Sequence, residues 1–418
     1  MIGSRTRTSA VHTRRKTSLG YHVVMTRTPL RISFAGGGTD LATFYDRDYG
    51  AVFSTAIDKY VYVTVKRHSE LFFEPIRINY SKTEQVNEIS EIENGIAREC
   101  LKLLEIEPPV YVSVVGDMPA STGLGGSSSF AVGLLHALHA LRDERVSAGQ
   151  LAEEASYIEI DVLRQPIGKQ DQYAAAFGGL NFLRFESGGR VTVEPQNVPA
   201  HKLSEFFDST LLLWTGMQRD ASSVLSEQKS NTQRNLPVLQ EIRSHAEQLR
   251  RLVSDGELDP MVVGAILHES WRRKRELATN VTTSRIDQWY DTAMTAGAEG
   301  GKLCGAGQGG FLLLLVRPEN RARVRSALSE LVEVEVRPEV HGSIVMMPFL
   351  GRLLAATAAL CSGDWSSLCG EVDSRPTSGA DSHGTSSRNG PVPGTDSAAV
   401  RSARRRSRRR VRGDAFCG

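Results

Sequence analysis

Glycine and serine dominate one short stretch of the chain, directly before a run of residues with helical periodicity. Within "PASTGLGGSSSFAVGLLHALHAL", residues 119–141, apolar side chains recur every three or four positions from Phe130 to Leu141. The start of a helix leaves backbone N–H groups without partners, and the helix dipole favours an anion there. Glycines let an anion approach those groups closely, and serine hydroxyls can reach a metal ion. We therefore predict that this turn binds a polyphosphate, through Gly123, Gly125, Gly126, Ser127, Ser128 and Ser129. The alternative is a capped helix after a flexible loop, with no ligand.

Two carboxylates flank a helix break in "YIEIDVLRQPIGKQDQYAAAFGGLNF", residues 157–182. Pro166 and Gly168 end one helix, and the next begins at "QDQYAAAF". Asp171 then lies near a helix start, where an ionised carboxylate can orient a sugar hydroxyl and take its proton as a general base. Glu159 lies before the break and is a candidate ligand for Mg²⁺, which prefers one or two carboxylates together with phosphates and water. The alternative is an N-cap aspartate with a solvated glutamate.

Other glycine-rich patterns limit the kind of nucleotide site. The chain has no GxxxxGK[ST] sequence, and no HRD or DFG triplet where a protein kinase would need one. "GAGQGG", residues 305–310, matches GxGxxG, but a dinucleotide site requires a strand before it and a helix after it. Here a helix-like segment ending in "AGAEGGKLC" precedes the glycines and the strand "FLLLLV" follows. We therefore predict that the backbone of this glycine run lies close to another segment of the chain or to a ligand.

The segments around these residues alternate between strand and helix patterns. "YVYVTVK" (60–66) and "VYVSVV" (110–115) alternate with period two, and "FLLLLV" (311–316) is typical of a buried strand. Apolar residues from Leu236 to Val253 repeat with helical spacing. After "FLLLLV", Pro318 opens a predicted helix and "VEVEV" (332–336) a further strand. The sequence thus predicts a mixed α/β (α+β) fold.

Composition and charge divide the chain into four parts. The formal net charge is +2, but residues 1–24 carry five basic and no acidic side chains, and residues 350–418 carry eleven basic and six acidic ones, so residues 25–349 carry about −8. An acidic body argues against a nucleic-acid surface on it; contact through "RSARRRSRRRVR" (401–412) is an accessory alternative. We predict a disordered basic leader (1–24), an N-terminal domain (25–187), a C-terminal domain (205–349) and a disordered arginine-rich tail (350–418).

Cysteine usage and hydropathy bear on the compartment. The five cysteines include no CxxC pair, which favours reduced thiols over a disulfide framework or a zinc site. No stretch reaches the ~20 apolar residues of a membrane helix, so no membrane partner is expected. Both observations predict a cytoplasmic protein. The oligomeric state is left open, with a homodimer as one alternative.

Three segments, in order, resemble the three motifs of the GHMP small-molecule kinases: "TPLRISFAGGGTDL", "PASTGLGGSSSFAVGLL" and "KLCGAGQGGFLLLL". The segments "IGKQDQYAAAFGGLNF", "GMQRDASSVLSEQ" and "HESWRRKRELA" are similar to one branch, the D-glycero-D-manno-heptose 7-phosphate kinases and related sugar-phosphate kinases. The likeness covers residues 25–349 and neither tail. It implies a two-domain fold, with an N-terminal domain like the second domain of ribosomal protein S5 and a ferredoxin-like C-terminal domain.

The resemblance also implies roles for residues around the phosphate cradle. ATP would lie between the domains, with its phosphates over the glycine-serine turn. Ser127 and Glu159 match the family's magnesium ligands, and Asp171 matches its catalytic aspartate. Arg31 matches an arginine beside that aspartate, where it would stabilise the attacking oxygen. Gly126 departs from the usual "GLGSSS", which removes one hydroxyl contact to the nucleotide but keeps a backbone N–H.

Further residues are expected to meet the sugar or to close the cleft. Asp40 would accept from sugar hydroxyls, beside Gly37, Gly38 and Thr39. Gly305 and Gly307 would let the backbone pack against the phosphate loop. An acceptor that already carries a phosphate also needs basic side chains at its far end, and the candidates are Lys169, Arg219 and Lys274.

The implied reaction is transfer of the γ-phosphoryl group of ATP to a sugar hydroxyl, which needs positioning and charge neutralisation more than covalent chemistry. In the heptose branch the acceptor atom is O1 of D-glycero-D-manno-heptose 7-phosphate. Two alternatives stay open. One is a kinase for another sugar, an octose phosphate or mevalonate. The other is a non-catalytic sensor of the same fold that binds ATP and sugar without turnover.

Overall fold

The computed structural model describes residues 23–69, 71–218 and 222–349. The predicted tail (350–418) and all but the last two residues of the predicted leader (1–24) lie outside the described residues, as does Arg219. Regular structure begins at Val23, two residues before the start predicted from the sequence. No helix in the described ranges is both long and apolar enough to cross a membrane.

The larger sheet has eight strands and is built around one long strand, β2 (Gly50–Arg67). The first half of β2 pairs with β6 (Leu180–Phe185) and its second half with β5 (Val110–Gly116), while β1 (Val23–Ala35) runs antiparallel along nearly its whole length. The last strand, β12, pairs with β1, so the chain ends its described part beside the strand with which it begins. The path runs through β12 (Ile344–Phe349), β1 (Val23–Ala35), β2 (Gly50–Arg67), β5 (Val110–Gly116), β3 (Ile76–Asn79) and β4 (Thr83–Val86), with β6 (Leu180–Phe185) beside β2 and β7 (Val191–Pro195) beside β6.

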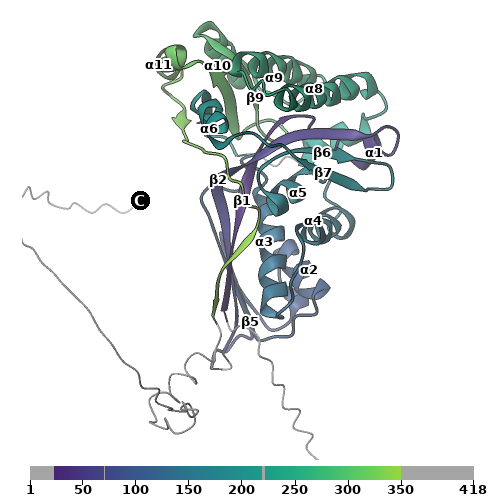
Figure 1. Ribbon diagram of the computed structural model, residues 1–418. Helices are drawn as coiled ribbons and strands as arrows, with labels where there is room; N and C mark the ends of the chain where they lie inside the picture. The colour runs from purple at the N-terminus through teal and green to yellow at the C-terminus, as the bar shows by residue number, and fades with distance from the viewer. Residues whose placement is uncertain (1–22, 70, 219–221, 350–418) are drawn as a thin grey trace, which may run out of the picture. The chain divides into compact units, whose positions relative to one another are not determined.

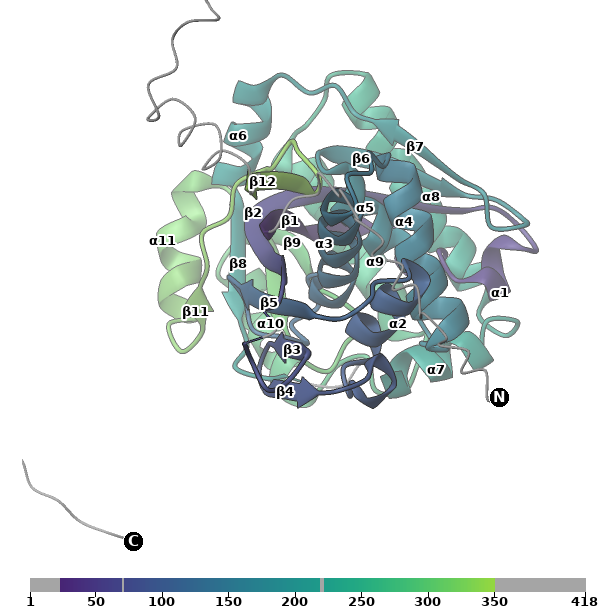
Figure 2. The ribbon, with the colours of Figure 1, turned by 90° about the horizontal axis from the view of Figure 1, so that it is seen from below.

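One face of this sheet carries the helix that follows the glycine-serine turn. This helix, α3 (Gly126–Leu141), is buried on nearly all sides and packs on β1 and β2. A Cβ at Gly133 would lie 2.6 Å from Thr28 Oγ1, so the glycine permits the close contact with β1. Figure 2 shows α3 among its helical neighbours, which are α2 (Gly95–Leu103), α4 (Ala148–Ser156) and α5 (Gln170–Phe177). Shorter helical segments of the same half are α1 (Ala42–Tyr45), a 3₁₀ turn (Ile89–Glu91) and a π-helical segment (Tyr157–Val162).

The smaller sheet is antiparallel, and its strands run in the order β11-β8-β10-β9. Helices separate β8 from β9 and β10 from β11, which makes the β-α-β-β-α-β arrangement of a ferredoxin-like unit. The helices α8 and α9 lie side by side, α9 against β9 and α8 near β1 and β2 (Figure 1). The strands are β8 (Thr210–Trp214), β9 (Ala298–Leu303), β10 (Phe311–Val316) and β11 (Val332–Glu333), and the helices are α6 (Ala200–Asp208), α7 (Ser222–Ser230), α8 (Leu236–Ser254), α9 (Pro260–Arg275), α10 (Ser284–Thr295) and α11 (Pro318–Ala327).

One hydrophobic core joins the two halves of the described chain. It contains Val63 and Leu134 from the larger sheet and its helix together with Leu212, Leu249 and Leu313 from the second half. The domain boundary near 187–205 stays a prediction, and β7 and the start of α6 lie within that interval.

The strands at 60–66, 110–115 and 311–316 and the helices that begin at Leu236 and Pro318 are confirmed. Two expectations are wrong. The segment before the glycine run is not helical at its end, because Ala298–Leu303 forms β9, where Gly300 packs closely on Gly264 of α9.

The predicted strand 332–336 is also shorter than expected. Only Val332 and Glu333 pair as β11, opposite the end of β8. Val334 still donates to Leu212 O, but the chain then turns away and places Pro338 opposite Ile57 of β2. The alternation of valine and glutamate at 332–336 predicted a strand but not the turn that ends it.

Candidate active site

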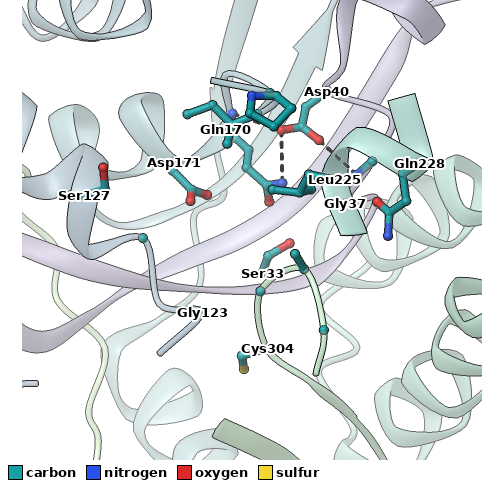
Figure 3. Close-up of a pocket in the computed structure, with 18 of the residues that line it drawn as sticks. Ser33, Gly37, Asp40, Gly123, Ser127, Gln170, Asp171, Leu225, Gln228 and Cys304 are labelled. Carbon is teal, nitrogen blue, oxygen red and sulfur yellow. Dashed lines mark hydrogen bonds between the residues drawn. The ribbon is translucent and has the colours of Figure 1, made fainter. Parts of the chain in front are cut away.

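The segments singled out in the sequence surround one cavity of about 280 Å³. It is lined by the glycine-serine turn, the segment 165–171, the end of β1, α7, α9 and the glycine run after β9. Figure 3 shows Asp171 and Ser127 on one side of this cavity and Gln228 on the other, with Asp40, Gln170 and Ser33 between them. Both halves of the chain therefore contribute side chains to the same space.

The N-terminus of α3 opens into this cavity. Gly125 is the N-cap residue and adopts φ 80°, a left-handed conformation that favours glycine. Gly123 is also left-handed, and a Cβ there would lie 2.5 Å from Cys304 O, so only glycine lets the turn meet the second glycine run. The N–H groups of the first turn have no helical partner, which leaves a site for an anion between the two glycine segments.

The three serines of the turn are placed differently. Ser127 lines the cavity, whereas Ser128 and Ser129 are buried in the first turn of α3. Ser129 Oγ donates to Pro29 O at 2.8 Å and thereby fixes the helix on β1. Of the three hydroxyls, that of Ser127 is therefore the one that faces the cavity.

Ser127 is hydrogen-bonded to a fully buried carboxylate. Its Oγ donates to Glu159 Oε1 at 2.6 Å, and Gln172 Nε2 donates to Glu159 Oε2 at 2.7 Å. Glu159 lies in the π-helical segment, a local widening that is frequent at functional sites. Burial raises the pKa of Glu159, and the hydrogen bonds from serine and glutamine oppose that shift. A hydroxyl and a carboxylate side by side are oxygen donors of the kind that Mg²⁺ prefers.

A bidentate ion pair lies beside the N-terminus of α3. Arg31 of β1 donates through Nε and Nη2 to the two carboxylate oxygens of Asp171, both at 2.7 Å, although the residues are 140 positions apart. Its Nη1 donates to Gly123 O at 2.6 Å, so one guanidinium links the aspartate to the turn. Arg31 is 5% exposed, and such fork-shaped pairs fix orientation as well as charge. Asp171 is thus held at the start of α5 with its carboxylate toward the cavity (Figure 3).

Asp40 also lines the cavity and is held by several donors. Gly38 N donates to Oδ1 at 2.9 Å, and Gln170 Nε2 donates to Oδ2 at 3.0 Å. Burial and the nearby charge of Asp171 raise the pKa of Asp40. The neighbouring Thr39 is fully buried, and its hydroxyl donates to Gly36 O, so it shapes the loop and does not line the cavity.

Two lysines line the cavity from the second half of the chain. Lys274 of α9 donates to Gly305 O, and Lys302 of β9 donates to Ser33 O at 2.7 Å. Both are buried, and within the described part of the chain neither makes an ion pair with a carboxylate. Burial lowers the pKa of Lys274 to about 8 and that of Lys302 to about 7. Buried cations without a paired carboxylate favour an anionic ligand.

Sequence reasoning missed Lys302. It is preceded by two glycines in "EGGKL", and a lysine inside a buried strand is the signal that could have identified it. Lys302 then becomes the third cation of the cavity beside Arg31 and Lys274.

Of the other predicted site residues, Lys169 lies outside the cavity, whereas Gly37, Gly38, Gly305 and Gly307 line it. Lys169 is turned away from the cavity, toward Glu153 Oε2 at 3.0 Å and Gly189 O at 2.9 Å. Gly305 lies against Gly123, as the sequence suggested for the glycine run, whereas Gly307 lies against the backbone of Val281. Gly37 and Gly38 line the cavity beside Asp40.

Comparison with known proteins bears on this arrangement. Residues 91–179 match the GHMP kinases N-terminal domain and residues 247–334 match the GHMP kinases C-terminal domain. The chain is similar to the D-glycero-alpha-D-manno-heptose 7-phosphate kinase of Campylobacter jejuni, with 29% identity over 73% of this chain and 93% of that protein. It is also similar to the galactokinase of Pyrococcus furiosus, with 25% identity over 73% and 92% of the two chains.

Among solved structures, the crystal structure of a D-glycero-D-manno-heptose 1-phosphate kinase from Bacteroides thetaiotaomicron matches with a TM-score of 0.64 and 25% identity, over 78% of this chain and 99% of that one. A galactokinase from Lactococcus lactis complexed with galactose matches with a TM-score of 0.61 over 78% and 95% of the two chains, at 17% identity, and therefore speaks only to the fold.

Proposed function

Because the chain belongs to the GHMP kinase family, whose members are ATP-dependent phosphotransferases with an alcohol acceptor, we propose that it phosphorylates O1 of D-glycero-D-manno-heptose 7-phosphate. The observation that carries this proposal is the bidentate pairing of Arg31 with Asp171 beside the N-terminus of α3. It puts a proton acceptor and a fixed positive charge next to a site for phosphate. The name of the Campylobacter relative supports the choice of a heptose phosphate.

Asp171 is the general base in this proposal. The acceptor hydroxyl gives its proton to the carboxylate as its oxygen bonds to the γ-phosphorus of ATP. The bond from that phosphorus to the bridging oxygen breaks, and ADP leaves. Arg31 orients the carboxylate and stabilises the negative charge that develops on the attacking oxygen. The N–H groups of the turn at 123–127 hold the phosphates in place.

Ser127, which lines the cavity, and Glu159, buried directly behind it, are the residues that would hold Mg²⁺, since they place a hydroxyl and a carboxylate side by side. Bound there, the ion would neutralise phosphate charge. Ser127 donates to one carboxylate oxygen of Glu159 and Gln172 donates to the other, so both side chains are held in position.

A phosphorylated acceptor is favoured by the two buried lysines. Lys274 and Lys302 bring positive charge into the cavity without a paired carboxylate, and a phosphate dianion would supply the missing charge. Asp40 would accept from a sugar hydroxyl while Gln170 keeps it in position.

Phosphorus NMR of the full chain with ATP, Mg²⁺ and heptose 7-phosphate tests the proposal. We expect a new anomeric phosphate signal that grows together with the ADP signals. The same assay is run with the free heptose, galactose, an octose phosphate and mevalonate. Turnover of another acceptor in preference to heptose 7-phosphate would overturn the substrate assignment. ATP binding without product from any acceptor would instead support the sensor.

A further inference from the structure

Helix α7 presents one of its faces to the cavity. Ser222, Leu225 and Gln228 follow each other at intervals of three and all line it. Val224, one turn before Gln228, is buried in the core of the smaller sheet. Glu227 accepts from Thr279 N at 2.9 Å, which ties α7 to the segment between α9 and α10. The helix is therefore fixed in position, with Gln228 toward the cavity.

Several polar atoms on this side of the cavity have no partner. Gln228 is 5% exposed, and its Nε2 makes no hydrogen bond within the described part of the chain. The same holds for Gln170 Oε1 and Ser33 Oγ, which line the same cavity. A buried donor or acceptor without a partner destabilises the protein, so its persistence at a cavity needs an explanation. A ligand that carries hydroxyl groups would satisfy all three atoms, because a hydroxyl both donates and accepts.

Gln228 lies on the other side of the cavity from the reacting end (Figure 3). Figure 3 shows it across the cavity from Asp171, with the carboxylate of Asp40 between them. A sugar whose reacting hydroxyl lies at Asp171 would therefore extend toward α7. The atoms near Gln228 would belong to carbons remote from the phosphorylated oxygen.

We propose that Gln228 determines acceptor specificity by donating through Nε2 to a sugar hydroxyl remote from the reacting oxygen, with Gln170 and Ser33 completing a polar wall for a polyhydroxylated chain. This inference rests on the proposed function, because Asp171 defines the reacting end. The residue contributes from the second half of the chain, whereas Asp40 and Gln170 belong to the first. In this proposal the amide of Gln228 recognises the acceptor sugar and takes no part in phosphoryl transfer.

Gln228→Met tests the proposal, since methionine keeps the length of the side chain and removes its donor. We expect kcat/KM for heptose 7-phosphate to fall about 10- to 100-fold, with the KM for ATP within about twofold of the original. Analogues of heptose 7-phosphate that lack one remote hydroxyl each are compared in parallel. For one of them the preference of the unaltered enzyme for the hydroxylated sugar should disappear in the variant.

Two further variants guard against a structural effect. Gln228→Glu keeps the shape and can accept from the hydroxyl, and it should recover part of the discrimination. Gln240→Met, at an exposed glutamine of α8, should leave every parameter unchanged. If Gln228→Met reduces kcat/KM equally for the full sugar and all deoxy analogues, or leaves the discrimination intact, the proposal is wrong.

Calorimetry separates this inference from the proposed function. Binding of heptose 7-phosphate to the full chain, with a non-hydrolysable ATP analogue present, is measured for the unaltered protein and for Gln228→Met. Weaker binding in the variant supports the role of Gln228 even if no turnover occurs, which would count against the kinase alone. No binding of heptose 7-phosphate, or equal binding to both proteins, would overturn the inference.

Discussion

The two sides of the cavity differ in how their polar groups are paired. On the phosphate side, every charged group has a partner from the same side: Arg31 with Asp171 and Gly123, and Glu159 with Ser127 and Gln172. We call this side the phosphate wall and define it as Arg31, Gly123, Ser127, Glu159 and Asp171.

From the middle of the cavity to its far side, polar groups are left over (Figure 3). Gln228 Nε2, Gln170 Oε1 and Ser33 Oγ have no partner within the described residues, and Lys302 has only backbone oxygens. We call this side the acceptor wall and define it as Ser33, Asp40, Gln170, Gln228 and Lys302.

The difference indicates a division of labour. Side chains that are already paired need not reorganise during the reaction. Such a wall suits phosphoryl transfer itself, the step that is the same for every acceptor. A wall with unpaired groups gains its partners only when a ligand binds, so it discriminates among acceptors. The following changes would break or sharpen this comparison.

The largest effect is expected at the phosphate wall. Asp171→Asn removes the proton acceptor but keeps the shape, and we expect kcat to fall about 10²- to 10⁴-fold. ATP binding, measured by calorimetry, should change little, because the turn at 123–127 is untouched. Asp161→Asn, at an exposed position before the helix break, is the matched control and should behave like the unaltered enzyme. Undiminished turnover in Asp171→Asn would show that another group is the base.

The contact between the two glycine runs should come next. In Gly305→Ala the new Cβ would lie 2.5 Å from Gly123 Cα, at a residue with φ +76°, so the turn must shift. We expect the KM for ATP to rise about 10- to 100-fold and the free energy of unfolding to fall by about 1–3 kcal/mol. Gly188→Ala is the control, because Gly188 has φ +79° and open space around it. Its kinetics should not change. Normal kinetics in Gly305→Ala would mean that the contact does not shape the phosphate site.

On the acceptor wall, Lys302→Met should act on the phosphorylated acceptor alone. We expect its KM to rise about 10-fold, and the KM for an unphosphorylated sugar to stay within about twofold. The free energy of unfolding should not fall, because a buried charge without a carboxylate partner is removed. Lys169→Met provides the comparison, since Lys169 pairs with Glu153 outside the cavity. A larger effect on the KM for the phosphorylated acceptor in Lys169→Met than in Lys302→Met would show that the acceptor's phosphate binds near Lys169 instead.

The same lysines predict a pH dependence. The pKa of Lys302 is lowered to about 7 and that of Lys274 to about 8, in both cases chiefly by burial. The ammonium form binds phosphate, so binding is strong below these pKa values and weakens as the pH rises through them. We expect kcat/KM for the phosphorylated acceptor to fall up to about 10-fold between about pH 6.5 and 8.5. In Lys302→Met the fall should begin closer to pH 8. A profile that rises over this range would contradict the assignment.

The smallest effect is expected at Gly126, where the usual serine is absent. Gly126 is the first residue of α3, and a Cβ there meets only Leu30 Cδ2 at 3.9 Å. Gly126→Ser should therefore fit without strain and lower the KM for ATP about two- to threefold by adding a hydroxyl donor. The melting temperature should rise slightly, because serine favours a helix more than glycine does. A higher KM for ATP would show that the glycine is needed for the approach of the phosphates.

The sequence by itself predicted the local features of the phosphate wall. Glycines before a helical repeat mark a helix start, and Pro166 marks a break, because both act through the conformations of neighbouring residues. The confirmed strand at 60–66 and the helix from Leu236 follow from periodicity in the same way. The resemblance of three segments to the motifs of the GHMP kinases then predicted the roles of Arg31 and Asp171.

Only the tertiary structure decided the acceptor wall. Lys302 and Gln228 stand in two of the segments that carry the resemblance, "KLCGAGQGGFLLLL" and "GMQRDASSVLSEQ", but nothing in the sequence marks either side chain as buried at a cavity. Lys302 and Gln228 are buried because β9 and α7 line the same cavity as β1 and the start of α5, which are distant from them along the chain. A local sequence pattern reflects the backbone conformation of a residue and its neighbours. It does not record which distant side chains remain without a partner once the two sheets have packed together.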